Sequence, residues 1–314
     1  MKILYLVVPC YNEEEVLPET TKRLVAKYQN LIQSEIIDPL SRIVYVNDGS
    51  KDKTWEIISQ IVSDNQYFHG IKLSRNKGHQ NALLAGLMYA KEKADIVISM
   101  DADLQDDIDA IDAFIKANDE GFDVVYGVRS ARKTDTFFKK TTAELFYKLM
   151  KALGADIVYN HADYRLMSKR ALEGLESFTE ANLFLRGIVP LIGYPSTKVY
   201  YERNERFLGE SKYPFKKMLN FAFDGITSFT VKPIRMISVV GFFVFSVSIL
   251  IMMYFFYAYF AGKTVAGWAT TVISIWALGG LQLLAIGIIG EYIAKTYIEA
   301  KQRPKFIIES IIGK

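Results

Sequence analysis

Two aspartates separated by one residue, Asp101 and Asp103, have the spacing that points most directly to chemistry in this chain. They follow a short apolar run, so at the end of a buried strand both carboxylates can turn toward one cation, and Gln105 adds an amide oxygen. Oxygen ligands of this kind suit Mg²⁺ or Mn²⁺, which commonly link protein carboxylates to substrate phosphates. The sequence therefore predicts a metal site made of Asp101, Asp103 and Gln105. The acidic residues that continue the run, Asp106 to Asp112, are expected to cap a helix and to contact solvent.

Further polar residues follow other short apolar runs. The segment Asn47-Asp48-Gly49-Ser50 predicts a tight turn in which Asp48 is also able to accept a hydrogen bond from a nucleobase or ribose. Lys77 has the charge to meet a diphosphate. The three histidines lack the spacing of a metal site and are expected to be solvated or structural: His69, His79 and His161.

These residues need a scaffold, and the first 130 residues alternate short apolar runs with helical patterns. We expect strands at Ile3–Val8, Arg42–Asn47, Gly70–Leu73, Asp95–Met100 and Asp123–Tyr126. We expect helices near Glu14–Ile32, Lys53–Val62, Gly78–Ala90 and Asp107–Asn118. This alternation predicts an α/β fold with a mostly parallel sheet covered on both faces. Ligands of such sheets bind beyond the carboxyl ends of the strands, where the polar segments lie.

The composition excludes several classes of protein. Of 314 residues, 50% are hydrophobic and 13% aromatic, which is too many for a disordered chain. The single cysteine, Cys10, excludes an internal disulfide and clustered thiolate metal sites. The net charge of +3 conceals an asymmetry, because residues 1–130 carry a net charge of −7 and residues 131–314 a net charge of +10. The acidic part contains the predicted metal ligands, and the basic part suits an anionic surface.

Two long uncharged runs lie near the C-terminal end, one of 24 residues from Ile237 to Phe260 and one of 22 residues from Trp268 to Ile289. A helix needs about 20 apolar residues to cross a bilayer, so we expect two transmembrane helices. The alternative is a buried hairpin of a soluble protein, but soluble helices of this length normally have a polar face. The short connection between the runs makes the hairpin antiparallel.

Basic residues flank this hairpin unevenly. Nine Lys and Arg residues lie beside its outer ends, and one, Lys263, lies in its loop. Because positive charge favours the cytoplasmic side, we expect an integral inner or plasma membrane protein with two spans and with cytoplasmic N- and C-termini. The N-terminal residues lack the pattern of a secretion signal. Phe215, Leu219 and Phe223 suggest an amphipathic helix on the bilayer surface.

Taken together, these residues resemble the glycosyltransferases of family two. The nearer likeness is to the polyprenyl-phosphate glycosyltransferases, which include dolichol-phosphate mannose synthase and bacterial undecaprenyl-phosphate glucosyltransferases. It covers the whole chain, including the C-terminal hairpin of the bacterial subgroup. The resemblance rests on the motifs PCYNEEE, NDGSKDKT, RNKGHQNALLAG and DADLQD, and it implies a GT-A-like nucleotide-sugar-binding domain.

The resemblance also assigns residues to the nucleotide-sugar donor. It implies that the nucleoside is held by Pro9, Tyr11 and Glu13, and that Asp48 binds the base or ribose. The donor site is completed by Lys77, Asp101 and Ala102, with Mg²⁺ or Mn²⁺ on Asp101, Asp103 and Gln105. Asp103 and Asp163 are the expected catalytic residues; whether Asp163 is a base or orients an arginine is left open.

Three further motifs resemble the acceptor side of the family. They are GVRSAR at 127–132, DYRLM at 163–167, in which Tyr164 replaces phenylalanine conservatively, and the basic loop from Arg203 to Tyr213. The resemblance makes their polar residues partners of the donor diphosphate and of the lipid phosphate. These expected acceptor or diphosphate residues are Arg129, Arg132, Arg203, Arg206, Ser211 and Lys212.

The implied reaction is the inverting transfer of a hexose, with glucose slightly favoured, from a UDP-linked or other nucleotide-diphosphate sugar to polyprenyl (undecaprenyl) phosphate. The expected organisation is a cytoplasmic glycosyltransferase domain at 1–213, a juxtamembrane amphipathic helix at 214–235, two transmembrane helices at 236–290 and a cytoplasmic tail at 291–314. No nucleic-acid partner is expected, and Gly280 and Gly287 would permit close helix contacts in a homo-oligomer.

Two alternative functions fit the sequence less well. A processive polysaccharide synthase of the same superfamily would carry a Q-x-x-R-W motif and several spans, and this chain has neither. A non-catalytic membrane scaffold or transporter component would not require the aligned residues Asp48, Asp101 and Asp103.

Overall fold

The computed structural model describes residues 1–129, 161–180, 184–202, 232–261 and 267–313. The chain divides into two compact units. The first comprises Met1–Tyr147, Asp156–Pro214 and Arg303–Lys314, and the second comprises Lys148–Ala155 and Phe215–Gln302.

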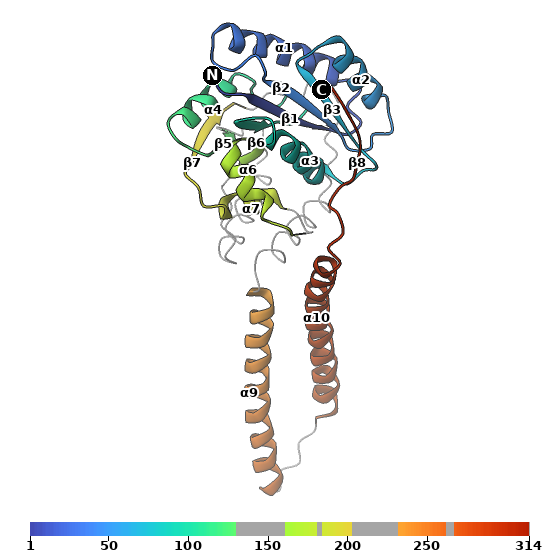
Figure 1. Ribbon diagram of the computed structural model, residues 1–314. Helices are drawn as coiled ribbons and strands as arrows, with labels where there is room; N and C mark the ends of the chain where they lie inside the picture. The colour runs from blue at the N-terminus through green and yellow to red at the C-terminus, as the bar shows by residue number, and fades with distance from the viewer. Residues whose placement is uncertain (130–160, 181–183, 203–231, 262–266, 314) are drawn as a thin grey trace. The chain divides into compact units, whose positions relative to one another are not determined.

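The first unit is built on one eight-stranded sheet in the order β7-β5-β6-β4-β1-β2-β3-β8 (Figure 1). Neighbouring strands are parallel in β5–β7 and throughout β4-β1-β2-β3, whereas β6 is antiparallel to β4 and β5, and β8 is antiparallel to β3. The sheet is therefore mixed but mostly parallel. Its strands are β1 (Leu4–Cys10), β2 (Arg42–Asn47), β3 (Phe68–Leu73), β4 (Ile96–Ser99), β5 (Val124–Arg129), β6 (His161–Ser168), β7 (Ser196–Tyr201) and β8 (Ile308–Ile312).

Helices cover both faces of this sheet. They are α1 (Leu17–Gln33), α2 (Thr54–Asp64), α3 (His79–Lys91), α4 (Ala110–Asp119), α6 (Lys169–Glu176) and α7 (Leu185–Leu191). Side chains of β1 alternate between the faces, so Leu4 and Leu6 join the core formed with α1 and α4, while Val7 faces α3. A Cβ atom on Gly86 of α3 would lie 2.3 Å from Val7 Cγ1, so this glycine lets α3 approach the sheet closely.

The five strands and four helices predicted in the first 130 residues are confirmed, with small differences at their ends. The antiparallel strand β6 was not predicted as a strand, although its residues carry the DYRLM motif. Its insertion between β4 and β5 brings Asp163 and Arg165 beside the end of β4.

Strand β8 was not predicted either. Residues 303–314 belong to the first unit, where β8 pairs with β3 through Gly70↔Ile312 and Lys72↔Ser310. Lys72 Nζ lies 2.7 Å from Glu309 Oε1, and Lys305 Nζ donates to the carbonyl oxygen of Phe178 at 3.0 Å. The C-terminal segment is therefore part of the sheet of the first unit.

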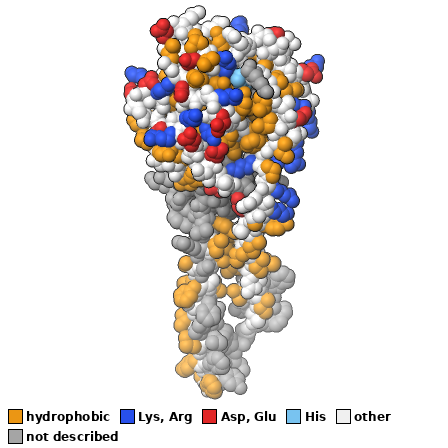
Figure 2. Space-filling view, viewed as in Figure 1, with side chains coloured by type: hydrophobic (Ala, Val, Ile, Leu, Met, Phe, Trp, Pro, Cys, Tyr) orange, Lys and Arg blue, Asp and Glu red, His pale blue; other side chains and the backbone are white. Residues whose placement is uncertain are grey.

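The second unit contains two long helices that contact each other, α9 (Lys232–Phe260) and α10 (Trp268–Ala300). Both predicted apolar runs are thus helical. Large apolar side chains are exposed on both (Figure 2), for example Phe260 (83% exposed) and Leu283 (72% exposed). Among the described residues, one segment, Leu278–Ala300, is long and apolar enough to cross a membrane by length and composition. The first of the two predicted spans, Ile237–Phe260, does not meet that test there.

Candidate active site

The carboxyl ends of β4, β1 and β2 lie side by side at one edge of the sheet. The chain runs outward from β1 to β2 and β3, and then returns to place β4 on the other side of β1. Such a reversal of strand order opens a crevice between the loops of an α/β sheet. The motifs PCYNEEE, NDGSKDKT, RNKGHQNALLAG and DADLQD lie at this point, because each begins near the end of β1, β2, β3 or β4.

The loops after β1 and β2 are joined to each other by hydrogen bonds. The backbone N–H of Asn12 donates to Ser50 Oγ at 3.0 Å, and Asn12 Oδ1 accepts from the N–H of Lys51 at 2.9 Å. The N–H of Glu13 donates to Thr54 Oγ1 at 2.9 Å. The PCYNEEE and NDGSKDKT motifs therefore form one connected surface, on which Pro9 is buried in β1 and Tyr11 is 41% exposed.

Asp48 connects β2 to the loop before α3. Its carboxylate is buried and accepts from the backbone N–H groups of Lys77 at 2.7 Å and Gly78 at 2.9 Å. Burial raises the pKa of Asp48, and these two hydrogen bonds oppose that shift. Gly49 adopts φ +63°, and a Cβ atom there would lie 2.5 Å from the backbone N of Asn76. The turn thus needs glycine, and Asp48 fixes the backbone of Lys77.

The DADLQD loop is fixed by both its own backbone and α1. Thr20 Oγ1 donates to the carbonyl oxygen of Ala102 at 2.9 Å, and the N–H of Gln105 donates to Asp103 Oδ1 at 3.2 Å. Leu104 adopts φ +58° and is buried, which turns the chain between Asp103 and Gln105. Ala102 is buried as well, while Asp101 and Asp103 remain partly exposed.

His79, at the start of α3, lies between two aspartates. Its Nε2 is 3.5 Å from Asp101 Oδ1 and 3.6 Å from Asp163 Oδ2. Burial would lower the pKa of His79, but Asp163 and Asp101 outweigh it and raise that pKa to about 9. At neutral pH the imidazole is therefore a cation that links the end of β4 to β6. The His79 side chain is 40% exposed, in keeping with the expectation of a solvated role, but that expectation did not include these two aspartates.

Asp163 lies among three basic side chains, those of Arg165, Arg186 and His79. It accepts from Arg165 at 2.7 Å and from Arg186 Nε at 3.2 Å and Nη2 at 3.1 Å, and its own side chain is 10% exposed. Burial alone would raise the pKa of Asp163, but Arg186, His79 and Arg165 together hold it well below its usual range. Asp163 is therefore ionised at neutral pH and is surrounded by cations.

The prediction that Asp106 contacts solvent is wrong. Its side chain is fully buried, and its Oδ1 accepts from Tyr201 Oη at 2.5 Å and lies 3.4 Å from Arg129 Nη2. The arginine at the end of β5 is thus held beside the DADLQD loop. Asp109 and Asp112 are exposed, as predicted, and Lys27 Nζ lies 2.8 Å from Asp109 Oδ1 and 2.5 Å from Asp112 Oδ2. The predicted capping is not seen at Asp109, the N-cap of α4, whose side chain makes no cap hydrogen bond; its N–H donates to Asp107 Oδ1.

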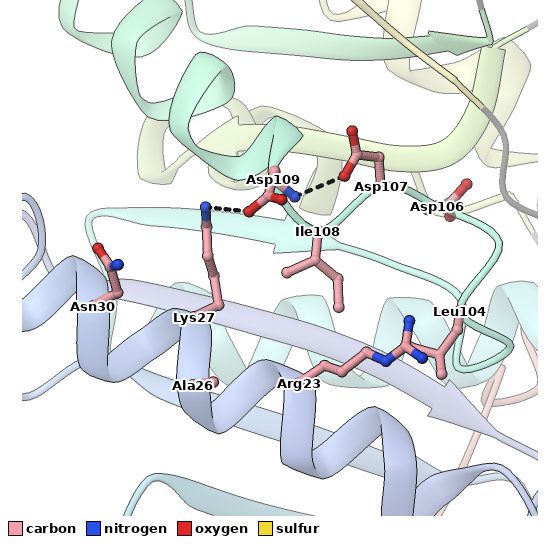
Figure 3. A pocket seen from close by; sticks show the side chains of 9 residues that line it. All are labelled: Arg23, Ala26, Lys27, Asn30, Leu104, Asp106, Asp107, Ile108 and Asp109. Atoms are coloured by element: carbon pink, nitrogen blue, oxygen red, sulfur yellow. Dashed lines mark hydrogen bonds and ion pairs between the residues drawn. The ribbon is translucent and has the colours of Figure 1, made fainter.

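A surface groove of about 580 Å³ borders this loop on its α1 side (Figure 3). Lys27 reaches across it from α1 to Asp109, and Leu104 and Ile108 contribute its apolar lining. It contains neither Asp101 nor Asp103. The groove is therefore a junction between α1 and the start of α4 and not the centre of the candidate site.

The donor set of the DADLQD loop fits a hard divalent cation. Burial raises the pKa of Asp101 to about 6, with Asp106, Asp163 and Asp103 adding to the shift and His79 opposing it. Such mutual repulsion of carboxylates is relieved by a bound cation. Within the described parts of the chain, no group of three or more His, Cys, Asp or Glu side chains is arranged as a metal site, so the predicted set depends on two carboxylates and the Gln105 amide.

Several predicted residues lie outside the described part of the chain: Arg132, Arg203, Arg206, Ser211 and Lys212. The predicted amphipathic helix at 214–235 lies there too, except for its last residues, which begin α9. Conversely, sequence reasoning missed His79, Arg186 and Asp106. The position of His79 directly after the loop that follows β3 was the available signal, whereas nothing local marks Arg186, which α7 brings to Asp163 from 23 residues away.

The sequence profile of glycosyl transferase family 2 matches residues 5–175. An uncharacterized glycosyltransferase of Bacillus subtilis strain 168 is 55% identical over 307 residues, covering 98% of this chain and 91% of the relative. A bactoprenol glucosyl transferase of Shigella phage SfV is 41% identical over 307 residues, covering 97% of both chains. A prophage bactoprenol glucosyl transferase homolog of Escherichia coli strain K12 is 39% identical, covering 98% of both.

Proposed function

The chain belongs to glycosyl transferase family 2 and is a glycosyltransferase, and we propose that it transfers glucose from a UDP-linked donor to polyprenyl (undecaprenyl) phosphate with inversion at the anomeric carbon. The choice of glucose and of a polyprenyl acceptor is supported by relatives named bactoprenol glucosyl transferase, whose likeness extends over 97% of this chain.

One structural observation carries the proposal most directly. Asp101 and Asp163, from the ends of β4 and β6, converge on His79, with Asp103 two residues further along the β4 loop. This cluster adjoins the loops of β1 and β2, where we propose that Pro9, Tyr11, Glu13 and Asp48 hold the nucleoside. Donor and acceptor would then meet at the edge of the sheet formed by β1, β4 and β6.

The proposed acceptor, a lipid phosphate, has little need of a general base to deprotonate it. The second pKa of a phosphate monoester is about 6, so a lipid phosphate is largely a dianion at neutral pH and needs little deprotonation before it attacks. Asp163 has a pKa well below its usual range, because Arg186, His79 and Arg165 outweigh its burial. We therefore favour the second of its two predicted roles: Asp163 orients Arg186 and His79 toward the reacting phosphates.

Asp101, Asp103 and Gln105 would hold the divalent cation. A bound Mg²⁺ or Mn²⁺ would neutralise charge on the leaving diphosphate. Lys77, whose backbone is fixed by Asp48, would add a positive charge from the loop before α3, and Arg129 another from the end of β5.

We further propose that α9 and α10 span the membrane as a hairpin, with the glycosyltransferase domain at 1–213 and both termini on the cytoplasmic side. Support comes from the length of the two helices, their exposed apolar side chains and the flanking lysines and arginines. Arg203 and Arg206, which lie outside the described residues, keep their predicted role as partners of the lipid phosphate in this proposal.

Radiolabelled sugar transfer tests the reaction. Membranes containing the full chain would be supplied with undecaprenyl phosphate and with one labelled nucleotide sugar at a time. Label from UDP-glucose is expected in the organic phase, and treatment with mild acid should release it as a sugar. Label only from another donor would refute the choice of glucose, and label in a long water-soluble polymer would refute the acceptor.

A further inference from the structure

Three side chains form a closed ring of contacts beside the DADLQD loop. Tyr201 Oη donates to Asp106 Oδ1 at 2.5 Å, Arg129 Nε donates to Tyr201 Oη at 3.3 Å, and Arg129 Nη2 lies 3.4 Å from the same oxygen of Asp106. The Asp106 side chain has no exposed surface, whereas that of Arg129 is 20% exposed. Part of the arginine side chain is therefore open to solvent, whereas the carboxylate is not.

The sheet brings these residues together from distant parts of the chain. Arg129 and Tyr201 are the last residues of β5 and β7, and they are direct partners in the parallel register of these strands. The Tyr201 ring packs edge-on against Tyr164 with a centroid distance of 5.3 Å, and Tyr164 Oη donates to the carbonyl oxygen of Asp107 at 2.9 Å. Tyr201 and Tyr164 thus hold the loop at the consecutive residues Asp106 and Asp107. The contacts among Arg129, Tyr201 and Asp106 therefore have little freedom to change.

Burying the charged carboxylate of Asp106 costs free energy unless an interaction with that charge offsets the cost. Asp106 Oδ2 is buried without a hydrogen-bond partner, so packing alone would favour an uncharged residue here. The charge of Asp106 fixes the side chain of Arg129. Without this contact, the flexible arginine would lose conformational entropy when it binds a ligand. The ring therefore holds one guanidinium in place at the edge of the metal loop.

We propose that Asp106 is a positioning residue that, together with Tyr201, holds Arg129 ready to bind a phosphate group. That group is either the donor diphosphate or the acceptor phosphate, since a guanidinium recognises both through the same charge-assisted hydrogen bonds. The inference rests on the proposed function for the presence of phosphates, but part of its test needs no sugar transfer.

The probe is inorganic pyrophosphate, titrated calorimetrically into the full-length chain in detergent. Asp106→Asn keeps an acceptor for Tyr201 and removes the charge, Tyr201→Phe keeps the ring packed on Tyr164, and Arg129→Gln removes the guanidinium. Asp106→Asn and Arg129→Gln should each weaken pyrophosphate binding about tenfold, with a smaller loss for Tyr201→Phe. In the Arg129→Gln background, Asp106→Asn should add less than about a twofold change, because it acts through Arg129.

The matched control is Asp107→Asn in the same loop, which should leave pyrophosphate affinity unchanged. Unchanged affinity in Asp106→Asn, losses that multiply in the double variant, or no pyrophosphate binding by the wild type would each overturn the proposal. A rise in KM for the nucleotide sugar would identify the donor diphosphate as the ligand, and a rise in KM for the lipid would identify the acceptor. Wild-type protein that binds pyrophosphate but transfers no sugar would refute the proposed function alone.

Discussion

Asp163 and Arg165, two residues apart on β6, form an ion pair of 2.7 Å in which the arginine side chain is only 2% exposed. Arg165 also donates to the carbonyl oxygen of Leu185 at 3.4 Å, and its Nε is buried without a partner. The buried guanidinium thus depends on Asp163 for its compensating charge. Asp163 is accordingly both a central group of the site and a structural requirement of the strand that carries it.

The first prediction follows from this pair. Asp163→Asn should destabilise the first unit by about 3–5 kcal/mol, because it leaves a buried arginine without its counter-charge. Thermal unfolding in detergent measures the change. The double variant Asp163→Asn with Arg165→Met should recover part of the loss, and Asp109→Asn, which breaks an exposed pair with Lys27, should cost less than about 1 kcal/mol. Equal losses in the single and double variants would show that the pair is not the cause.

The second prediction concerns the proposed metal ligands. Asp103→Asn should lower sugar transfer by about 100-fold at saturating Mg²⁺ or Mn²⁺. It removes a ligand of the metal ion, and the charge of that ion stabilises the leaving diphosphate. Wild-type activity should disappear with a chelator and return with the metal, and the unfolding temperature of Asp103→Asn should stay close to that of the wild type. Full transfer by Asp103→Asn with metal present would refute the assignment.

The third prediction tests the close approach at Gly49. Gly49 and Gly121 both have positive φ, +63° and +101°, but a Cβ atom on Gly121 would meet nothing within 4 Å. Gly121→Ala therefore measures the backbone strain alone, about 1 kcal/mol. Gly49→Ala should cost clearly more, because the backbone of Arg75 and Asn76 must move, and it should also weaken nucleotide-sugar binding by displacing Lys77. Equal unfolding temperatures for the two variants would contradict this account.

Some residues of the candidate site could be predicted from the sequence, and others could not. The loops that carry Asp48 and Asp101 could be predicted, because hydrophobic periodicity places the strands and parallel strands end at a common edge. Arg186 and Tyr201 could not. The role of Arg186 depends on β6, which carries Asp163 and enters the sheet between β4 and β5, and that of Tyr201 depends on the pairing of β7 with β5. No local pattern encodes these long-range pairings. Asp106 was misjudged for a related reason, since an acidic run looks solvated until a distant tyrosine and arginine are placed on it.

Tyr164 shows that a motif does not reveal every contact of its side chains. As a replacement for phenylalanine in the DYRLM motif it looks conservative, and its ring does pack on Phe114 with centroids 4.6 Å apart. Its hydroxyl, however, donates to the carbonyl oxygen of Asp107 and so holds the acidic loop. A motif identifies the ring but not the partner of its hydroxyl, because that partner lies 57 residues away.

The fourth prediction concerns the C-terminal strand. A chain ending at Gln302 lacks β8, which exposes the edge of β3 and removes Ile312 from its place over Gly70. Its first unit should unfold at a lower temperature and should aggregate, as size-exclusion chromatography in detergent would detect. Ile312→Asp should act in the same direction, whereas Glu309→Gln, which breaks the half-exposed pair with Lys72, should change stability by about 0.5 kcal/mol or less. Unaltered unfolding of the shortened chain would show that β8 does not stabilise the sheet.

The fifth prediction is a pH dependence that arises away from the site, at His69 on β3. This histidine is 6% exposed, and its Nδ1 lies 2.9 Å from the hydroxyl of Tyr89. Burial, with the positive charges of Arg42 and Lys93, lowers the pKa of His69 from 6.5 to about 4. The folded protein therefore favours the neutral ring, whereas the unfolded chain takes up a proton below pH 6.5. Stability from this group is complete above pH 6.5 and is lost as the pH falls toward 4.

The expected loss over that range is up to about 3 kcal/mol, from about 1.4 kcal/mol for each unit of pKa shift. Other groups also titrate there, so the measurement is the difference between wild type and His69→Asn, whose side-chain oxygen is able to replace Nδ1 as the partner of Tyr89. His69→Asn should be less stable than the wild type at pH 8, and the gap between their unfolding temperatures should narrow as the pH falls from 6.5 to 4. A gap that stays constant over this interval would mean that His69 keeps an ordinary pKa in the folded protein.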